Sequence, residues 1–269
     1  MKALRAEEEW ARDIISQTLS LPVEQHDDGS SNGMHDLWIL HGNAPLAAVE
    51  VTAAADPESM KLWRLVNSGD RWIVDGLVGG WAISLVPSSA RAKWRVKQFP
   101  AFLSQLEEAG VRAVDVEEGQ VGLGRWQSRA RDLGIASAFR SGTEFPGSVY
   151  ISIDAPLERS AGFVALTGDP IAAWVGTFLQ SERPDVVAKL GRSGAKERHA
   201  FVLVPGFTTA PFVVSELLTR KHAALPVEEP DLPIEVTHVW IVGMWHDVEG
   251  CCWAPHKGWS AVRTPHLPL

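Results

Sequence analysis

The sequence predicts an α/β protein in which helices flank a central mixed sheet. Short apolar runs typical of buried strands alternate along the chain with segments whose apolar residues recur at helical spacing. With 45% hydrophobic and 22% charged residues, the composition of the 269-residue chain is ordinary for a globular protein. No internal repeat and no long Pro/Gly/Ser linker is present, so we expect one compact domain over residues 1–269.

The first part of the chain is expected to form a helix, three strands and a second helix. The first helix covers residues 3–19 and ends at Leu21-Pro22. Its apolar face consists of Trp10, Ala11, Ile14, Ile15 and Leu19. The three strands are expected at residues 23–26, 35–41 and 46–54. Asp56-Pro57-Glu58 then has the composition of a helix start, and this second helix reaches about Asn67.

The rest of the chain continues the alternation of strands and helices. The later strands are expected at 81–86, 149–153, 201–204 and 239–242, and the later helices at 99–109, 121–133, 170–190 and 212–222. The second half is therefore an additional α/β region. The sequence leaves open whether it extends the first sheet or forms a second lobe.

Several classes of protein are disfavoured by simple features of the chain. No apolar run reaches the length of about 18 residues that a membrane span requires, so no membrane partner is expected. The acidic N-terminal segment lacks the apolar core of a signal peptide. Cys251 and Cys252 are adjacent and do not suggest a disulfide framework. We therefore expect a cytoplasmic protein.

The net charge of -8 argues against a protein that coats nucleic acid, but it allows a nuclease with a local basic cleft. A candidate for such a cleft is the segment 90–97, in which Arg91, Lys93, Arg95 and Lys97 alternate with other residues. In an extended conformation these side chains would form one positive row that follows a phosphate backbone. A solvated, charged edge strand is the alternative.

Two acidic residues occur at positions where burial of a carboxylate should cost free energy of folding. Glu50 lies inside the apolar run Leu46–Ala55, and Asp36 opens the strand-like run Leu37–Leu40. A carboxylate in an apolar strand is expensive unless it is paired, hydrogen-bonded or bound to a cation. Because alternate residues of a strand share a face, Asp36 can meet Glu50 across neighbouring strands. Their oxygen atoms suit Mg²⁺ or Mn²⁺, and no organic cofactor is expected.

This arrangement resembles the PD-(D/E)xK nuclease superfamily, whose fold is restriction-endonuclease-like. The resemblance covers about residues 1–90 and rests on His35-Asp36, on Glu50-Val51-Thr52, and on Glu8 in the first helix. It implies that Asp36, Glu50 and the backbone carbonyl of Val51 bind one divalent cation. It also implies that Glu8 tunes this ion or holds a second. A solvated acidic first turn is the alternative for Glu7-Glu8-Glu9.

The sequence departs from this family at the motif lysine, where Thr52 stands. In the family that lysine orients the attacking water and stabilises the developing charge, and Thr52 can only hydrogen-bond a water. Lys61, on the helix expected after the strand, is the nearest replacement, and Lys189 is a more remote one. A solvated helix residue is the alternative for Lys61, and a simple β-former is the alternative for Thr52.

Two further groups of residues were considered as sites. His246, Cys251, Cys252 and His256 contain zinc-ligand types, but adjacent cysteines rarely chelate one tetrahedral ion and no Cys-x-x-Cys is present. The segment Lys196–His199 is either a polar entrance to the strand at 201–204 or a source of basic groups for the acids.

The sequence thus predicts a divalent-metal-dependent nuclease, a hydrolase that acts on nucleic acid, with DNA favoured over RNA. A homodimer or a subunit of a larger complex is the expected assembly. A non-enzymatic alternative has the same fold with a lapsed site that serves as a binding or assembly module. A second alternative is an unrelated α/β protein in which Asp36 and Glu50 are structural partners of buried arginines.

Overall fold

The computed structural model describes residues 3–66, 72–88, 90–116, 124–154, 165–220, 222–244 and 249–264. The chain divides into two compact units, each with its own sheet. Unit 1 consists of residues 1–55 and 157–268, and unit 2 of residues 56–156. Residues 157–268 contribute strands to the sheet that contains β1–β3, and residues 56–156 form a separate unit.

Unit 1 contains a seven-stranded mixed sheet with strand order β1-β2-β3-β9-β10-β11-β12. Its elements are α1 (Ala6–Leu19), β1 (Val23–Gln25), β2 (Leu37–His41), β3 (Ala44–Ala53), α6 (Asp169–Ser181), α7 (Pro184–Arg192), β9 (Glu197–Val204), α8 (Phe212–Leu217), β10 (His238–Gly243), β11 (Glu249–Ala254) and β12 (Gly258–Arg263). Strands β3, β9 and β10 are parallel, whereas β1, β2, β11 and β12 add antiparallel pairs at the two sides.

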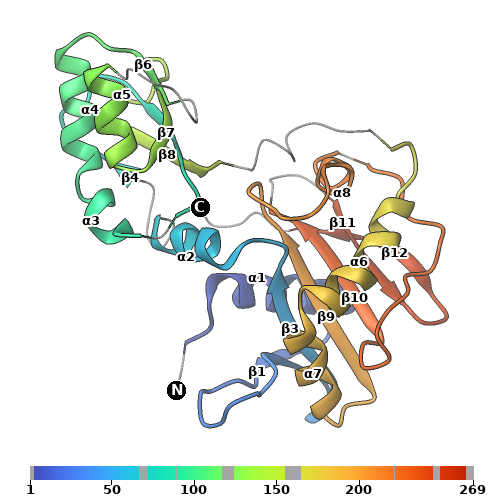
Figure 1. The fold of residues 1–269 in the computed structure, drawn as a ribbon. Coiled ribbons are helices and arrows are strands. Elements are labelled where there is room, and N and C mark those ends of the chain that lie inside the picture. The colour runs from blue at the N-terminus through green and yellow to red at the C-terminus, as the bar shows by residue number, and fades with distance from the viewer. Residues whose placement is uncertain are drawn as a thin grey trace. The chain divides into compact units, whose positions relative to one another are not determined.

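Helices cover both faces of this sheet (Figure 1). The apolar face of α1, including Trp10 and Ile14, packs with Val49 and Phe201 of the sheet. Helices α6, α7 and α8 pack on the opposite face, where Ala48 belongs to their core cluster. Because neighbouring residues of β3 point to opposite faces, Glu50 lies on the side covered by α7. The expected α/β class with helices flanking a mixed sheet is confirmed.

Unit 2 contains a five-stranded mixed sheet with strand order β4-β8-β5-β7-β6. Its elements are α2 (Pro57–Val66), β4 (Trp72–Ile73), β5 (Trp81–Leu85), α3 (Ala92–Val96), α4 (Phe99–Glu108), β6 (Ala113–Asp115), α5 (Arg125–Asp132), β7 (Ile135–Arg140) and β8 (Ser148–Ile153). Glu107 of α4 anchors this helix to the sheet, since it accepts hydrogen bonds from Val78 N, Gly79 N and Trp81 Nε1.

Three expectations are corrected by the fold. The helix expected over 170–190 is two helices, because Pro184 disfavours helical geometry at Arg183 and starts α7. The segment 91–97 is not extended but contains the short helix α3. Residues 56–90, which the resemblance assigned to the same core as residues 1–55, belong to unit 2. Among the described residues, no helix has the length and apolar character needed to cross a membrane.

Candidate active site

Asp36 and Glu50 stand opposite each other on neighbouring strands of unit 1. The antiparallel register of β2 and β3 pairs Leu37 with Val49, so Asp36 and Glu50 occupy the next position. Both side chains are buried, with exposed fractions of 2% and 3%. Asp36 Oδ2 accepts a hydrogen bond from Val51 N at 2.8 Å. Glu50 Oε2 is buried and has no hydrogen-bond partner among the described residues.

The lysine that contacts Glu50 is Lys189 of α7. Its Nζ donates to Glu50 Oε1 at 2.6 Å, although the two residues are 139 positions apart in the sequence. Helix α7 is amphipathic, and Val186 and Leu190 pack it into the core next to the strand that carries Glu50. The side chain of Lys189 remains 26% exposed, so its amino group lies at the boundary between the acids and solvent.

The N-terminal turn of α1 adds two more carboxylates and one guanidinium. Glu7 and Glu8 are buried, with exposed fractions of 4% and 2%. Arg5 contacts Glu8 at 2.5 Å and approaches Asp36 Oδ1 to 3.6 Å and Glu7 to 3.6 Å. The alternative of a solvated first turn is therefore wrong for Glu7 and Glu8, while Glu9 is exposed as that alternative expected.

Negative charge exceeds positive charge in this cluster. Burial, followed by the charge of Asp36, raises the pKa of Glu50 to about 8. Burial also raises the pKa of Asp36 to about 6, although the Val51 hydrogen bond and Arg5 act in the opposite direction. The carboxylates in turn raise the pKa of Lys189, which stays protonated. A proton shared by the acids, or a bound cation, would relieve the remaining repulsion.

Thr52, at the position of the motif lysine, is held by an arginine. Arg183, between α6 and α7, donates from Nε to Thr52 Oγ1 at 3.1 Å. Its Nη2 also donates to the carbonyl oxygens of Ala53 and Ala55, at 2.7 and 2.9 Å. This guanidinium therefore fixes the end of β3 just beyond Glu50. The hydroxyl proton of Thr52 remains able to donate a hydrogen bond.

The other predicted site residues lie in unit 2. Lys61 is exposed and pairs with Glu58 at 2.6 Å, which agrees with the alternative of a solvated helix lysine. The four basic residues of the segment 91–97 do not form one row. At about 100° per residue, helical geometry places Arg91 and Arg95 on one side of α3 and Lys93 and Lys97 on another.

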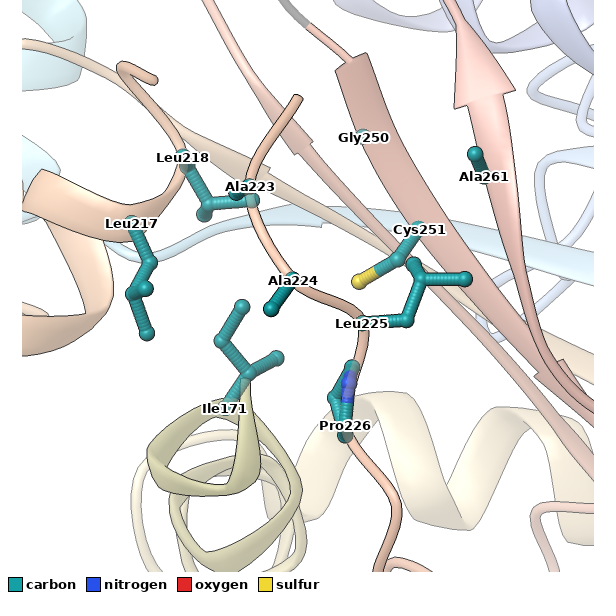
Figure 2. Close-up of a pocket in the computed structure, with 10 residues that line it drawn as sticks. All are labelled: Ile171, Leu217, Leu218, Ala223, Ala224, Leu225, Pro226, Gly250, Cys251 and Ala261. Atoms are coloured by element: carbon teal, nitrogen blue, oxygen red, sulfur yellow. The ribbon is translucent and has the colours of Figure 1, made fainter. Parts of the chain in front are cut away.

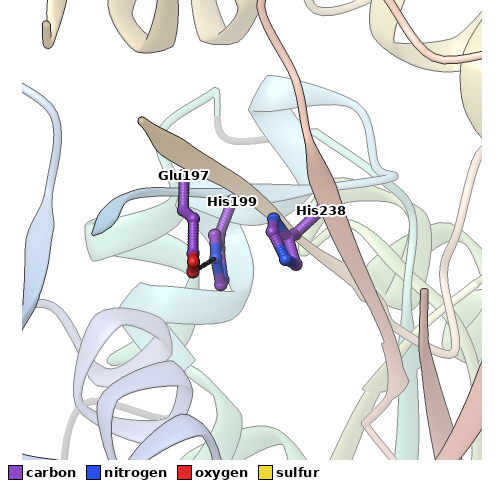
Figure 3. Close-up of side chains that lie close together, drawn as sticks. All are labelled: Glu197, His199 and His238. Atoms are coloured by element: carbon purple, nitrogen blue, oxygen red, sulfur yellow. Dashed lines mark ion pairs between the residues drawn. The ribbon is translucent and has the colours of Figure 1, made fainter. Parts of the chain in front are cut away.

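A second group of potential metal ligands lies at the start of β9 and β10 (Figure 3). Glu197, His199 and His238 offer ligand atoms within 4.8 Å of one another. The two imidazole rings stack with their centroids 4.1 Å apart. Burial lowers the pKa of His199, and it lowers the pKa of His238 to about 4, so both rings are neutral near pH 7.

The hydrogen bonds of this group do not favour a metal ion. Trp240 Nε1, which can only donate, gives a hydrogen bond to His199 Nδ1 at 3.1 Å. Neutral His199 therefore carries its proton on Nε2, which faces Glu197 Oε2 at 3.5 Å. A metal ion would need the lone pair of that Nε2 atom. The group is better described as a buried Trp240–His199 hydrogen bond with the partly exposed Glu197 carboxylate 3.5 Å from the other ring nitrogen.

The pocket in Figure 2 is apolar and lies apart from the acids. It is lined by Ile171, Leu217, Leu218, Ala223, Ala224, Leu225, Pro226, Gly250, Cys251 and Ala261. Burial raises the pKa of the Cys251 thiol far above its usual range, so this thiol is unreactive. Of the residues considered for zinc, His246 lies outside the described residues, and no metal group among the described residues includes Cys251, Cys252 or His256.

Comparison with known proteins gave no family to which the chain can be assigned. No family model, no curated protein and no solved structure matches it. The site residues that sequence reasoning missed are Arg5, Glu7 and Arg183. Arg5 and Glu7 stand three residues and one residue before Glu8 in the sequence, which was an available signal, whereas Arg183 is 131 residues from Thr52.

Proposed function

We propose that the chain is a divergent PD-(D/E)xK nuclease, in which unit 1 is the restriction-endonuclease-like core. It hydrolyses phosphodiester bonds in nucleic acid with the help of Mg²⁺ or Mn²⁺. The observation that carries this proposal is the opposed, buried pair Asp36 and Glu50, with the amino group of Lys189 on Glu50. Helix α1, the β2–β3 pair, helix α7 and the parallel strand β9 support the proposal, because the resemblance expects a helix, a hairpin, a second helix and a further strand.

The donor set suits a hard divalent cation. Glu50 Oε2 is a carboxylate oxygen that makes no hydrogen bond within the described residues, and Asp36 Oδ1 lies 3.6 Å from the Arg5 guanidinium. Glu8 is the third candidate ligand. The backbone carbonyl of Val51 is a further candidate from the resemblance. A bound ion of this kind polarises a phosphodiester and lowers the pKa of a bound water.

Lys189 takes the role that sequence reasoning gave to Lys61. Its ammonium group is held on Glu50 and is partly exposed, so it can donate a hydrogen bond to a phosphate oxygen or to the attacking water. This would supply the positive charge that Thr52 lacks. Thr52 can hold a water by donating its hydroxyl proton while Arg183 keeps the strand end in place.

The test is cleavage of plasmid, linear and single-stranded substrates with Mg²⁺ or Mn²⁺ by the purified full chain. We expect Lys189→Met and Glu50→Gln to lose cleavage by at least about a hundredfold. Lys61→Met and the exposed control Lys196→Met should retain it. Loss in Lys61→Met with retention in Lys189→Met would contradict the proposed role of Lys189.

A second candidate is the lapsed site, in which unit 1 serves as a binding or assembly module. The contacts of Arg5 with Glu8 and Asp36 favour it, because a guanidinium already neutralises part of the cluster. No cleavage by the wild type on any substrate, together with no Mn²⁺ binding in calorimetry, would support this candidate and contradict the nuclease.

A further inference from the structure

Large apolar side chains are unusually exposed on one face of the unit 2 sheet. Ile73, Phe139 and Tyr150 lie on strands β4, β7 and β8, and their exposed fractions are 67%, 54% and 68%. The alternate residues of the same strands, such as Val149 and Ile151, are buried. One face of the sheet therefore forms the core of unit 2, and the other face is open. We call this second surface the open face.

The strand register arranges the open face in rows. Tyr150 is paired with Ala82, Ala82 with Phe139, and Phe139 with Ala113. A line across β8, β5, β7 and β6 therefore alternates large, small, large and small side chains. Neighbouring strands are about 4.8 Å apart, so each aromatic ring stands beside a gap of about one strand width.

This order of large and small side chains is complementary to the same order read in the opposite direction. If the order is reversed, Tyr150 faces Ala113 and Phe139 faces Ala82, so that every large side chain meets a small one. A two-fold axis that runs parallel to the strands between β5 and β7 produces this reversal. The adjacent row pairs Ser152 with Ser84, Ser84 with Ser137, and Ser137 with Asp115. Under the same axis, Ser152 can donate a hydrogen bond to Asp115 of a second copy.

The charge distribution also favours a second copy of the chain as the partner that covers the open face. Residues 56–156 contain as many Lys and Arg residues as Asp and Glu residues, so the acidic excess of the chain, with net charge -8, lies in unit 1. Two copies of an acidic chain repel each other least when they meet through their neutral parts. The open face also carries Asp115 and no row of basic residues, which disfavours nucleic acid as its occupant.

We propose that the open face of unit 2 is the contact surface of a symmetric homodimer. Two sheets pack face to face across the two-fold axis, with Tyr150 of each copy on Ala113 of the other and Phe139 on Ala82. An isologous contact of this kind uses one surface twice and closes after two copies. Interdigitation of large and small side chains then removes the exposed aromatic area from water.

The experiment is sedimentation equilibrium of the full chain over a wide range of concentrations. The wild type is expected to dimerise. Tyr150→Lys should weaken the dimer by about a hundredfold or more, because it places a charge in the apolar contact. The matched control is Ile234→Lys, at an apolar residue of unit 1 that is even more exposed than Tyr150, and it should leave the dimer unchanged. Phe139→Ser repeats the test if Tyr150→Lys lowers the melting temperature.

A pair of size-exchange variants tests the specific packing. Ala113→Tyr alone should weaken the dimer, because it places a ring against Tyr150 of the second copy. Ala113→Tyr combined with Tyr150→Ala exchanges the large and small positions and should restore the dimer. A monomeric wild type would overturn the proposal. A stronger dimer in Ala113→Tyr would also overturn it, since that result indicates unspecific apolar association.

Discussion

The substitution Glu50→Gln is expected to stabilise the metal-free protein at pH 8. In the folded chain the pKa of Glu50 is raised from 4.5 to about 8, chiefly by burial and by the nearby charge of Asp36. The folded state therefore holds a proton over a pH range in which the unfolded chain has lost it. In this range the free energy of unfolding falls as the pH rises, and Gln removes the cost of ionising residue 50.

The magnitude follows from the size of the shift. At about 1.4 kcal/mol for each pH unit, a change from 4.5 to about 8 corresponds to at most ~5 kcal/mol at pH 8 and above. Ionisation draws the neighbouring groups and water into new positions, which lowers this figure. We therefore expect Glu50→Gln to raise the free energy of unfolding by about 2 kcal/mol at pH 8 and by little at pH 5.

The assay is calorimetric unfolding in EDTA at pH 5, 6, 7 and 8, because calorimetry can resolve separate transitions of the two units. The control is Glu58→Gln, which breaks an exposed pair with Lys61 and should change stability by less than about 0.5 kcal/mol at any pH. Added Mn²⁺ should recover the stability of the wild type at pH 8 but not affect Glu50→Gln. A Glu50→Gln variant that is less stable than the wild type at pH 8 would contradict this prediction, because Glu50 would then be a structural partner of Lys189.

Two further substitutions have definite expected outcomes. Arg5→Ala should tighten Mn²⁺ binding about fivefold in calorimetry, because it removes a guanidinium that competes with the ion for the acids. The control Arg12→Ala should leave the affinity unchanged. An unchanged affinity in Arg5→Ala as well would mean that Arg5 does not compete with the ion. Gly176→Ala in α6 should lower the free energy of unfolding by about 1–3 kcal/mol, because the new Cβ meets the backbone carbonyl of Asp231. Gly191→Ala, whose new Cβ meets only the side chain of Glu235, should lower the free energy of unfolding by less. An equal decrease for the two variants would contradict this explanation.

Local patterns in the sequence were sufficient to predict the hairpin that carries the acids. Strand alternation placed Glu50 on the face opposite Val49, and the spacing to Asp36 suited two neighbouring strands. The burial of Glu8 was harder to predict. An acidic first turn is favourable to a helix in solvent as well, so the triplet Glu7-Glu8-Glu9 did not distinguish a site from a solvated turn.

Long-range contacts account for most of what the sequence did not reveal. Lys189 reaches Glu50 across 139 residues, and Arg183 reaches Thr52 across 131. No periodicity links such positions, because the contact depends on how α7 packs on the sheet. The segment 91–97 was misjudged for a related reason. Its alternating charges suit a strand, yet Ala92 is buried and anchors one side of a short helix.

The position of unit 2 in the sequence places Lys61 in a different compact unit from Glu50. The sequence placed Lys61 on the helix expected directly after the strand of Glu50. Here β3 ends at Ala53 and the chain enters unit 2 at Asp56, so the next helix, α2, belongs to a different core. The chain returns to unit 1 only after residue 156, and α7 is the helix that then packs against β3. Lys189 therefore follows Glu50 by 139 residues in the sequence yet contacts it in the fold, because residues 56–156 stand between β3 and the later elements of unit 1.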